Sequence, residues 1–163
     1  MNQNLSREIF CFFAEFFGYT FPGGICVKIF KNIILYAFGG LAYLGMELLW
    51  RGRSHGSMFL AGGACFLLLG ALNRARPRLP GWLRFPAGAL IITMVELAVG
   101  LLVNRRFAVW DYRDQWGNFC GQICPAFTAL WIPISALAMG VYELLEPSLD
   151  RILGRQTAKN RHG

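Results

Sequence analysis

Four apolar runs, separated by short polar or charged stretches, restrict what this chain can fold into: residues 33–50, 58–72, 86–103 and 125–145. A helix that crosses the hydrocarbon core of a bilayer needs about 20 predominantly apolar residues. Hydrophobic residues make up 55% of the chain and charged residues 15%, and the mean hydropathy is +0.42. This composition is too apolar for a soluble domain of 163 residues. We therefore predict an all-α, polytopic membrane protein whose single domain, residues 1–163, contains a four-helix transmembrane bundle.

The bundle is expected to occupy residues 33–146, and a basic cytoplasmic tail is expected over residues 147–163. The run 58–72 is short for a span, so the weakly polar residues 54–57 are expected to extend its helix backwards. Pro86 and Pro125 lie where the third and fourth helices would begin, a position that requires no amide donor. These two prolines predict where the last two helices start.

The first 32 residues have a different pattern from the four runs. Glu8, Glu15 and Tyr19 fall on one narrow helical stripe, and most of the neighbouring phenylalanines lie elsewhere around the helix. This pattern is typical of an amphipathic helix that lies in the membrane interface. The alternative is a fifth span, which would have to carry Glu15 and pass through the Pro-Gly-Gly stretch at residues 22–24.

The distribution of lysine and arginine predicts the orientation in the membrane. Eleven of these residues lie before the first run, between the second and third runs, or after the fourth, and five lie in the other two connections. Since the side richer in lysine and arginine faces the cytoplasm, we predict a multi-pass protein of the cell membrane with both termini in the cytoplasm. The net charge of +7 suits anionic lipid headgroups beside the spans. No nucleic-acid recognition module is recognisable, so no nucleic acid partner is predicted.

Two glutamates lie within the predicted spans. A charge near the centre of the bilayer costs about 2.5 to 3.5 kcal/mol on insertion scales, so Glu96 must be protonated, paired or in a wet cavity. Glu96 is therefore a candidate ligand or proton site, and the alternative is a structural ion pair with Arg105 or Arg51. Glu47 lies nearer the end of its span, where Arg51, four residues further on, is placed to form a helical ion pair with it.

The stretch VWDYRDQWGNFCGQIC, residues 109–124, concentrates aromatic rings and polar groups on the predicted outer face. Tryptophan and tyrosine favour the headgroup level, so Trp110 and Tyr112 are expected to anchor this loop. Asp111 is predicted to accept charge-assisted hydrogen bonds from Arg105 or Arg51 and to hold the loop as a lid over the bundle. The predicted polar cluster, a candidate ligand-binding site, has ten members: Glu47, Arg51, His55, Glu96, Arg105, Trp110, Asp111, Tyr112, Asn118 and Gln122.

The cysteines and histidines form no recognisable metal or catalytic motif. Cys120 and Cys124 are separated by three residues, which is not a standard zinc spacing, and His55 would need further ligands. A disulfide between the two cysteines is the alternative on an oxidising outer face, although a helical placement four residues apart would strain it. No nucleophile and base occur at a convincing spacing, so we predict no enzymatic activity, no metal and no cofactor.

Longer motifs carry a resemblance to a known family. The segments ELLWRGRSHGSMFLAGG, VELAVGLLVN, VWDY and GQIC resemble small bacterial membrane proteins classed as type IV ABC-transporter permeases, over residues 39–146. More distantly, the WDY loop is similar to that of the vertebrate transmembrane protein 229 family. The first resemblance implies a role in transport. Because the sequence contains no P-loop for ATP hydrolysis, an ATPase partner would be a separate subunit.

Two function hypotheses stay open at this point. The first is a permease-like transport component or small-solute-binding subunit, because intramembrane acids beneath a loop suit a small polar or cationic solute. The second is a structural or regulatory module that binds lipid or a protein partner without transport, for which basic rims and aromatic belts suffice. The small-residue runs GGLAYLG and AGGAC allow close helix contacts, either within one chain or in a homo-oligomer.

Overall fold

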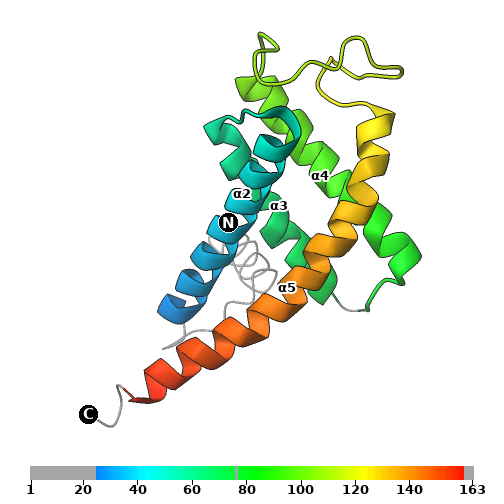
Figure 1. Cartoon of the computed structure of the whole chain (residues 1–163). Helices are drawn as coiled ribbons and strands as arrows, with labels where there is room; N and C mark the ends of the chain where they lie inside the picture. The colour runs from blue at the N-terminus through cyan, green and yellow to red at the C-terminus, as the bar shows by residue number, and fades with distance from the viewer. Residues whose placement is uncertain (1–24, 76, 160–163) are drawn as a thin grey trace, which may run out of the picture.

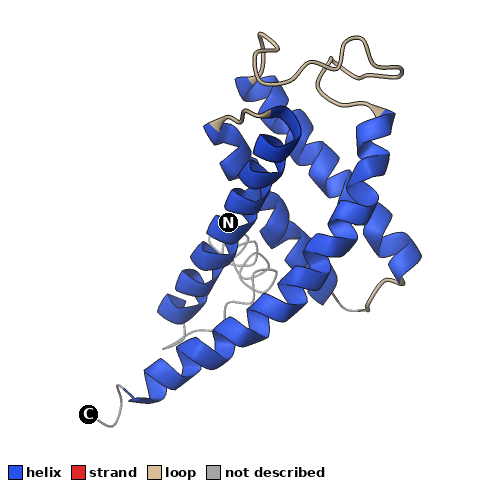
Figure 2. Cartoon of the chain, in the orientation of Figure 1, coloured by secondary structure: helices blue, strands red, loops and turns tan. Residues whose placement is uncertain are grey.

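The computed structural model describes residues 25–75 and 77–159, and over these residues the chain is helical with no β-strand (Figure 2). The helices are α2 (Ile25–Arg51), α3 (Gly56–Arg74), α4 (Gly81–Val103) and α5 (Pro125–Lys159). Each of the four contains a stretch long and apolar enough to cross a membrane. The predicted all-helical, four-span fold is therefore confirmed. The predicted interfacial helix of the N-terminal segment lies outside the described residues.

Helices α2 and α5 both extend beyond the apolar runs that predicted them. Helix α2 begins at Ile25, so residues 25–32 continue the first span instead of belonging to a separate segment. Helix α5 begins at Pro125, as predicted, and runs without interruption to Lys159. Residues 147–159 of the predicted tail therefore prolong the last helix.

Helix α4 begins earlier than its proline predicts. It starts at Gly81, which places Pro86 inside the helix, so the prediction that Pro86 opens it is wrong. Proline inside a helix removes one backbone hydrogen bond, and neighbouring helices commonly supply replacement partners in membrane proteins. Beside this proline, the hydroxyl of Ser135 on α5 donates to the carbonyl oxygen of Phe85 at 2.8 Å. This contact joins α4 to α5 in the half of the bundle away from the 104–124 loop.

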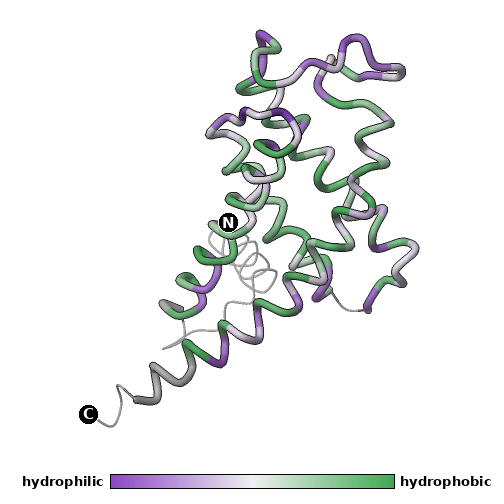
Figure 3. Tube along the Cα trace, in the orientation of Figure 1, coloured by the Kyte–Doolittle hydropathy of each residue, from purple (hydrophilic) through white to green (hydrophobic). Residues whose placement is uncertain are grey.

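The four helices pack as two hairpins, α2 with α3 and α4 with α5 (Figure 1). Helix α3 also contacts α4 and α5, so it joins the two hairpins and has the largest buried share of the four. Hydrophilic segments lie at the two ends of the bundle, and hydrophobic segments lie between them (Figure 3). This banding is the one expected of helices that span a bilayer.

Glycines bring α2 and α3 into close contact. A Cβ added at Gly62 on α3 would lie 2.4 Å from the Cβ of Tyr43 and 2.8 Å from the carbonyl oxygen of Gly39, both on α2. Such contacts are too short for any side chain at position 62. Small residues commonly permit this close approach of backbones in membrane helix pairs. Gly62 thereby fixes how Tyr43 stands in the bundle.

We expect Gly62→Ala to lower the free energy of unfolding by about 1 to 3 kcal/mol, because an overpacked contact forces the helices apart. Gly45→Ala is the matched control, because among the described residues no atom lies within 4 Å of a Cβ built there. The comparison requires unfolding of both variants in detergent micelles. Equal stability of the two variants would contradict the close packing at Gly62.

Ion pairs join α2, α3 and α5 at the end of the bundle opposite the 104–124 loop. The ammonium of Lys31 on α2 lies 3.2 Å from Glu146 and 2.8 Å from Asp150 on α5. Arg74 at the end of α3 pairs with the same Glu146. Helices α2 and α5 are thus held together at this end, whereas their loop-side ends lie apart (Figure 1).

Candidate functional site

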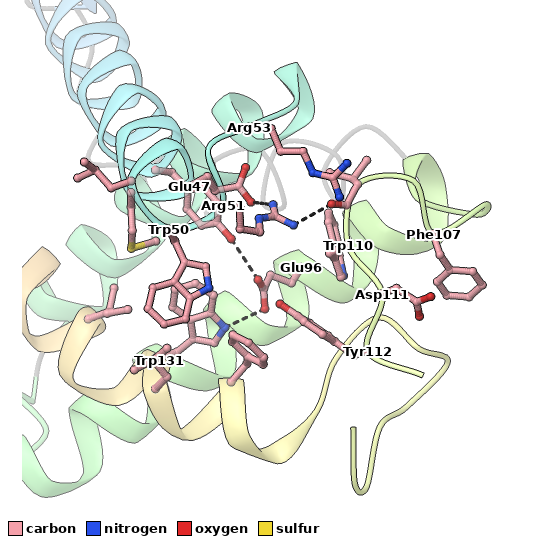
Figure 4. Close-up of a pocket in the computed structure, with 17 residues that line it drawn as sticks. Glu47, Trp50, Arg51, Arg53, Glu96, Phe107, Trp110, Asp111, Tyr112 and Trp131 are labelled. Carbon is pink, nitrogen blue, oxygen red and sulfur yellow. Dashed lines mark hydrogen bonds and ion pairs between the residues drawn. The ribbon is translucent and has the colours of Figure 1, made fainter. Parts of the chain in front are cut away.

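A cavity of about 670 Å³ lies beneath the 104–124 loop, between the loop-side parts of α2 and α5 (Figure 4). Its volume falls in the range of about 300 to 1,000 Å³ that is typical of small-molecule sites. The lining is mainly aromatic and apolar, with a few charged groups: Tyr43, Met46, Glu47, Leu49, Trp50, Arg51, Arg53, Glu96, Phe107, Val109, Trp110, Asp111, Tyr112, Phe127, Leu130, Trp131 and Ile134.

Glu96 is the single lining residue from α4, and it lies in the interior of the bundle with 6% of its surface exposed. The hydroxyl of Tyr43 donates to one carboxylate oxygen at 3.1 Å, and the indole N–H of Trp131 donates to the other at 2.8 Å. The two rings lie 6.0 Å apart between centroids, so they join α2 to α5 around the acid. Each oxygen of the Glu96 carboxyl group therefore has one hydrogen-bond donor.

The alternative of a structural ion pair between Glu96 and Arg105 or Arg51 is not realised. Within residues 25–75 and 77–153, no Lys, Arg or His nitrogen forms an ion pair with Glu96. Arg105, in the loop after α4, instead donates from Nε to the carbonyl oxygen of Leu101 on α4. Arg51 pairs with Glu47, which is the helical ion pair predicted from their spacing. Glu96 thus lies in the cavity wall with neutral donors only.

Arg51 also connects α2 to the loop. Besides its bond to Glu47, its guanidinium donates to the carbonyl oxygen of Val109 at 2.7 Å. Ser54 donates to the second oxygen of the Glu47 carboxylate, which leaves that carboxylate with a partner on each oxygen. One edge of the loop is therefore tied to the end of α2, above the cavity (Figure 4).

A buried amide pair holds the loop over the other hairpin. Asn104, the C-cap residue that follows α4, is 1% exposed and donates to the carbonyl oxygen of Trp110 at 2.6 Å and to the side-chain oxygen of Gln122 at 3.0 Å. Its own side-chain oxygen accepts from the backbone N–H of Val109 at 2.9 Å. The indole N–H of Trp110 donates to the carbonyl oxygen of Gln122 at 2.9 Å. These contacts fix the two halves of the loop to each other and to α4.

Local sequence explains why these groups approach so closely. A Cβ added at Gly100 would lie 2.4 Å from the side-chain oxygen of Gln122, so glycine leaves the space that this amide occupies. Gly121 has a φ of +64°, in the left-handed region that glycine tolerates better than other residues. The Tyr112 ring stacks on Phe127 of α5 with centroids 4.6 Å apart, and burial raises the pKa of the Tyr112 hydroxyl. Both ring and amide contacts seat the loop on the bundle.

The predicted pairing of Asp111 with Arg105 or Arg51 is wrong. Its carboxylate pairs with Arg113, two residues further on, with the shortest distance 2.6 Å. The Arg113 guanidinium lowers the pKa of Asp111, so the pair is intact at neutral pH and its contribution is lost only as the pH falls through that lowered pKa. Because this pair lies within one exposed turn, it does not attach the loop to the bundle.

Comparison with known protein families finds a match for this chain. A family model described as "Putative ABC-transporter type IV" matches residues 16–162. The chain belongs to this family. As a member of the type IV ABC-transporter family, it is an ABC-transporter-related membrane component, which agrees with its four apolar helices. No curated protein and no solved structure matches the chain, so the distant similarity to transmembrane protein 229 stays a prediction.

The cavity of this type IV family member includes some of the predicted cluster and leaves out the rest. Six members line it: Glu47, Arg51, Glu96, Trp110, Asp111 and Tyr112. Gln122 lies behind the lining in the amide network. His55 caps the start of α3 by accepting from the N–H of Ser57 at 3.2 Å, and Asn118 donates to the carbonyl oxygens of Arg113 and Gln115 within the loop. Arg105 lies exposed in the loop after α4, where it donates to the carbonyl oxygen of Leu101.

The cysteines whose side chains the structure describes form neither a disulfide nor part of a metal-binding cluster. Cys65, Cys120 and Cys124 are free thiols, so the alternative of a disulfide between the last two is not realised. Cys120 is exposed and Cys124 is buried. Among the described residues, no group of three or more His, Cys, Asp or Glu side chains could hold a metal ion.

The roles of three residues of the site could not be predicted from the sequence. Tyr43 and Trp131 were indistinguishable from ordinary core aromatics, although Tyr43 lies one helical turn before Glu47 and so shares its face. Asn104 ends an apolar run and gave only a weak signal, that of a polar residue at a helix end. Their roles depend on partners from distant segments, which the order of residues does not reveal.

Proposed function

We propose that this protein is a permease-like or solute-binding component of an ABC transporter, and that it binds a small polar or cationic solute in the cavity beneath the 104–124 loop. The observation that carries the proposal is Glu96, a buried carboxylate in the cavity wall without an ion-pair partner among the described residues. A charged acid at this depth costs free energy of insertion, and intramembrane ionisable groups commonly mark solute pathways. The surrounding aromatic lining is typical of small-molecule sites.

Energy for transport would come from a separate ATPase subunit, because the sequence has no P-loop. Family membership supports this partner and a membrane setting. The lysine and arginine distribution supports an orientation in which the ion-paired end faces the cytoplasm and the cavity faces outward. Close glycine contacts of the kind found between α2 and α3 also suit association of further copies in a homo-oligomer.

A structural or regulatory module is the second candidate, and the same glutamate supports it. Both oxygens of Glu96 already accept hydrogen bonds, so this side chain joins α2, α4 and α5 even in an empty cavity. In that case lipid or a protein partner would be the ligand, and Glu96 would contribute only to stability. The two candidates differ in whether its charge is needed.

Glu96→Gln separates the two candidates because it removes the charge and keeps the shape. The wild type and the variant would be extracted from their native membranes with a mild detergent and purified. The small molecules bound to each would then be identified by mass spectrometry. We expect a solute that is enriched on the wild type and lost from the variant. The same solutes on both proteins, bound with equal affinity, would overturn a solute site at Glu96. Glu143→Gln, which alters an exposed ion pair with Arg78 at the other end, is the control.

The proposed orientation predicts which cysteine is labelled in intact cells. In a variant that keeps Cys120 as its only thiol, a membrane-impermeant thiol reagent should react from outside, because this cysteine is exposed in the loop. In a second variant, whose only thiol is a cysteine introduced at Leu79, the reagent should react only after permeabilisation. Leu79 is exposed in the connection between α3 and α4. The reverse pattern of labelling would show that the termini face outward.

A further inference from the structure

The charges of the cavity leave one unbalanced group in its deep part. Glu47 is paired with Arg51, and Asp111 is paired with Arg113. Arg53 lies on the exposed connection that follows α2, at the rim (Figure 4). Glu96 lies seven residues before the end of α4 at Val103, which places it about 10 Å below that end. The deep part of the cavity therefore favours a positive charge.

The lining also determines what kind of cation fits. Seven aromatic residues surround the space: Tyr43, Trp50, Phe107, Trp110, Tyr112, Phe127 and Trp131. Ring faces attract cations, most strongly when the cation is desolvated, and they offer nothing to an anion. A Ca²⁺ or Mg²⁺ ion that had lost its water would instead need about six or more oxygen ligands from the protein, and the lining supplies far fewer. A weakly hydrated organic cation matches both the acid and the rings.

The exposed part of the lining indicates the route. Leu49 and Trp50 on α2 are 92% and 76% exposed, and Leu130 on α5 is 46% exposed, although all three line the cavity. Exposed apolar residues within spans face lipid in a bilayer. Above them, the loop is tied to α2 through Arg51 and Val109. The open side of the cavity thus lies between α2 and α5, towards the outer leaflet.

We infer that the cavity takes a hydrophobic organic cation, a monovalent ammonium or phosphonium group carried on an aromatic or aliphatic body, which enters between α2 and α5 from the outer leaflet. The charged group lies against Glu96, with Tyr43 and Trp131 around it, and the apolar body lies against Trp50 and Leu130. This inference rests on the proposed function and adds to it the class of substrate and the route.

Tetraphenylphosphonium and tetraphenylborate form a matched pair of probes, because they have nearly the same shape and opposite charges. The full-length protein in detergent micelles would carry Trp82→Phe and Trp116→Phe, which removes both tryptophans that lie outside the lining. Fluorescence then reports Trp50, Trp110 and Trp131 only. We expect saturable binding of tetraphenylphosphonium, at least tenfold weaker in Glu96→Gln and unchanged in Glu143→Gln. Trp50→Ala should weaken it several-fold.

Equal or tighter binding of tetraphenylborate would overturn the inference, as would tetraphenylphosphonium binding that is unaffected by Glu96→Gln. Acrylamide, a small neutral quencher, separates this failure from that of the proposed function. In a variant that also carries Trp50→Phe, the remaining Trp110 and Trp131 are both buried. If acrylamide quenched these two tryptophans but tetraphenylphosphonium did not bind, the cavity would be open to small solutes and the inference of a cationic substrate would be wrong. Protection of both from acrylamide would reject the cavity and the proposed function together.

Discussion

Asn104→Ala is expected to release the outer loop and to lower the free energy of unfolding by about 3 kcal/mol or more. The substitution removes the partner of two buried groups, the Trp110 carbonyl and the Gln122 side-chain oxygen, and of one part-buried group, the Val109 N–H. Each unsatisfied buried group costs about 1 to 3 kcal/mol. Amide hydrogen exchange over residues 105–122 should accelerate, because this amide network fixes the loop to α4.

Asn118→Ala is the matched control for this prediction. Asn118 donates to the carbonyl oxygens of Arg113 and Gln115, which are exposed, so water can replace this partner. It also accepts from the part-buried N–H of Gly121 in the same turn. Its exchange should change only within that turn. If Asn104→Ala left the exchange of residues 105–122 as slow as Asn118→Ala does, the amide pair would not be what holds the loop.

Glu96→Ala is expected to destabilise the bundle, whereas Glu96→Gln is expected to leave it nearly as stable as the wild type. Alanine leaves the Tyr43 hydroxyl and the Trp131 N–H without an acceptor, at a cost of about 2 kcal/mol or more. Glutamine preserves both contacts, because its side-chain oxygen can accept from Trp131 and its amide can donate to the Tyr43 oxygen. Unfolding in detergent micelles measures the difference.

Leu90→Ala is the control for this pair, because Leu90 lies on the same helix and is exposed to lipid. It should change the unfolding free energy less than Glu96→Ala does. A Glu96→Ala protein as stable as the Leu90→Ala protein would show that the two hydrogen bonds contribute little. Loss of folding in Glu96→Gln would show that the charge itself is structural, in favour of the second candidate function.

The spans and one ion pair could be predicted because they depend on local sequence. Hydropathy over about 20 residues is enough to place a helix in a bilayer. The pairing of Glu47 with Arg51 follows from their spacing on one helix. The helix starts were harder, since Pro86 lies inside α4 where a hydrogen bond from Ser135 on α5 reaches the neighbouring carbonyl.

The partners of Asp111 and Glu96 could not be predicted, for two different physical reasons. Asp111 had several arginines within reach along the chain, and the pair that forms is the one closed by the shortest turn, with Arg113. For Glu96 the sequence left a protonated, an ion-paired and a hydrated carboxyl open, and the contacts that form are hydrogen bonds from neutral donors on α2 and α5. Both outcomes depend on how the loop and the hairpins lie relative to each other, which the pattern of apolar residues leaves undetermined.

The central claim, that solute binds in the cavity beneath the loop, is tested most directly by filling that cavity. In a cysteine-free background, Leu130→Cys places a thiol in the cavity wall on α5, and Leu137→Cys places one on the same helix outside the lining. Both would be modified with a bulky maleimide, and binding of the solute that co-purifies with the wild type would be measured. The expected result is that modification at position 130 abolishes binding and that modification at position 137 leaves binding intact. Full binding with position 130 modified would contradict it.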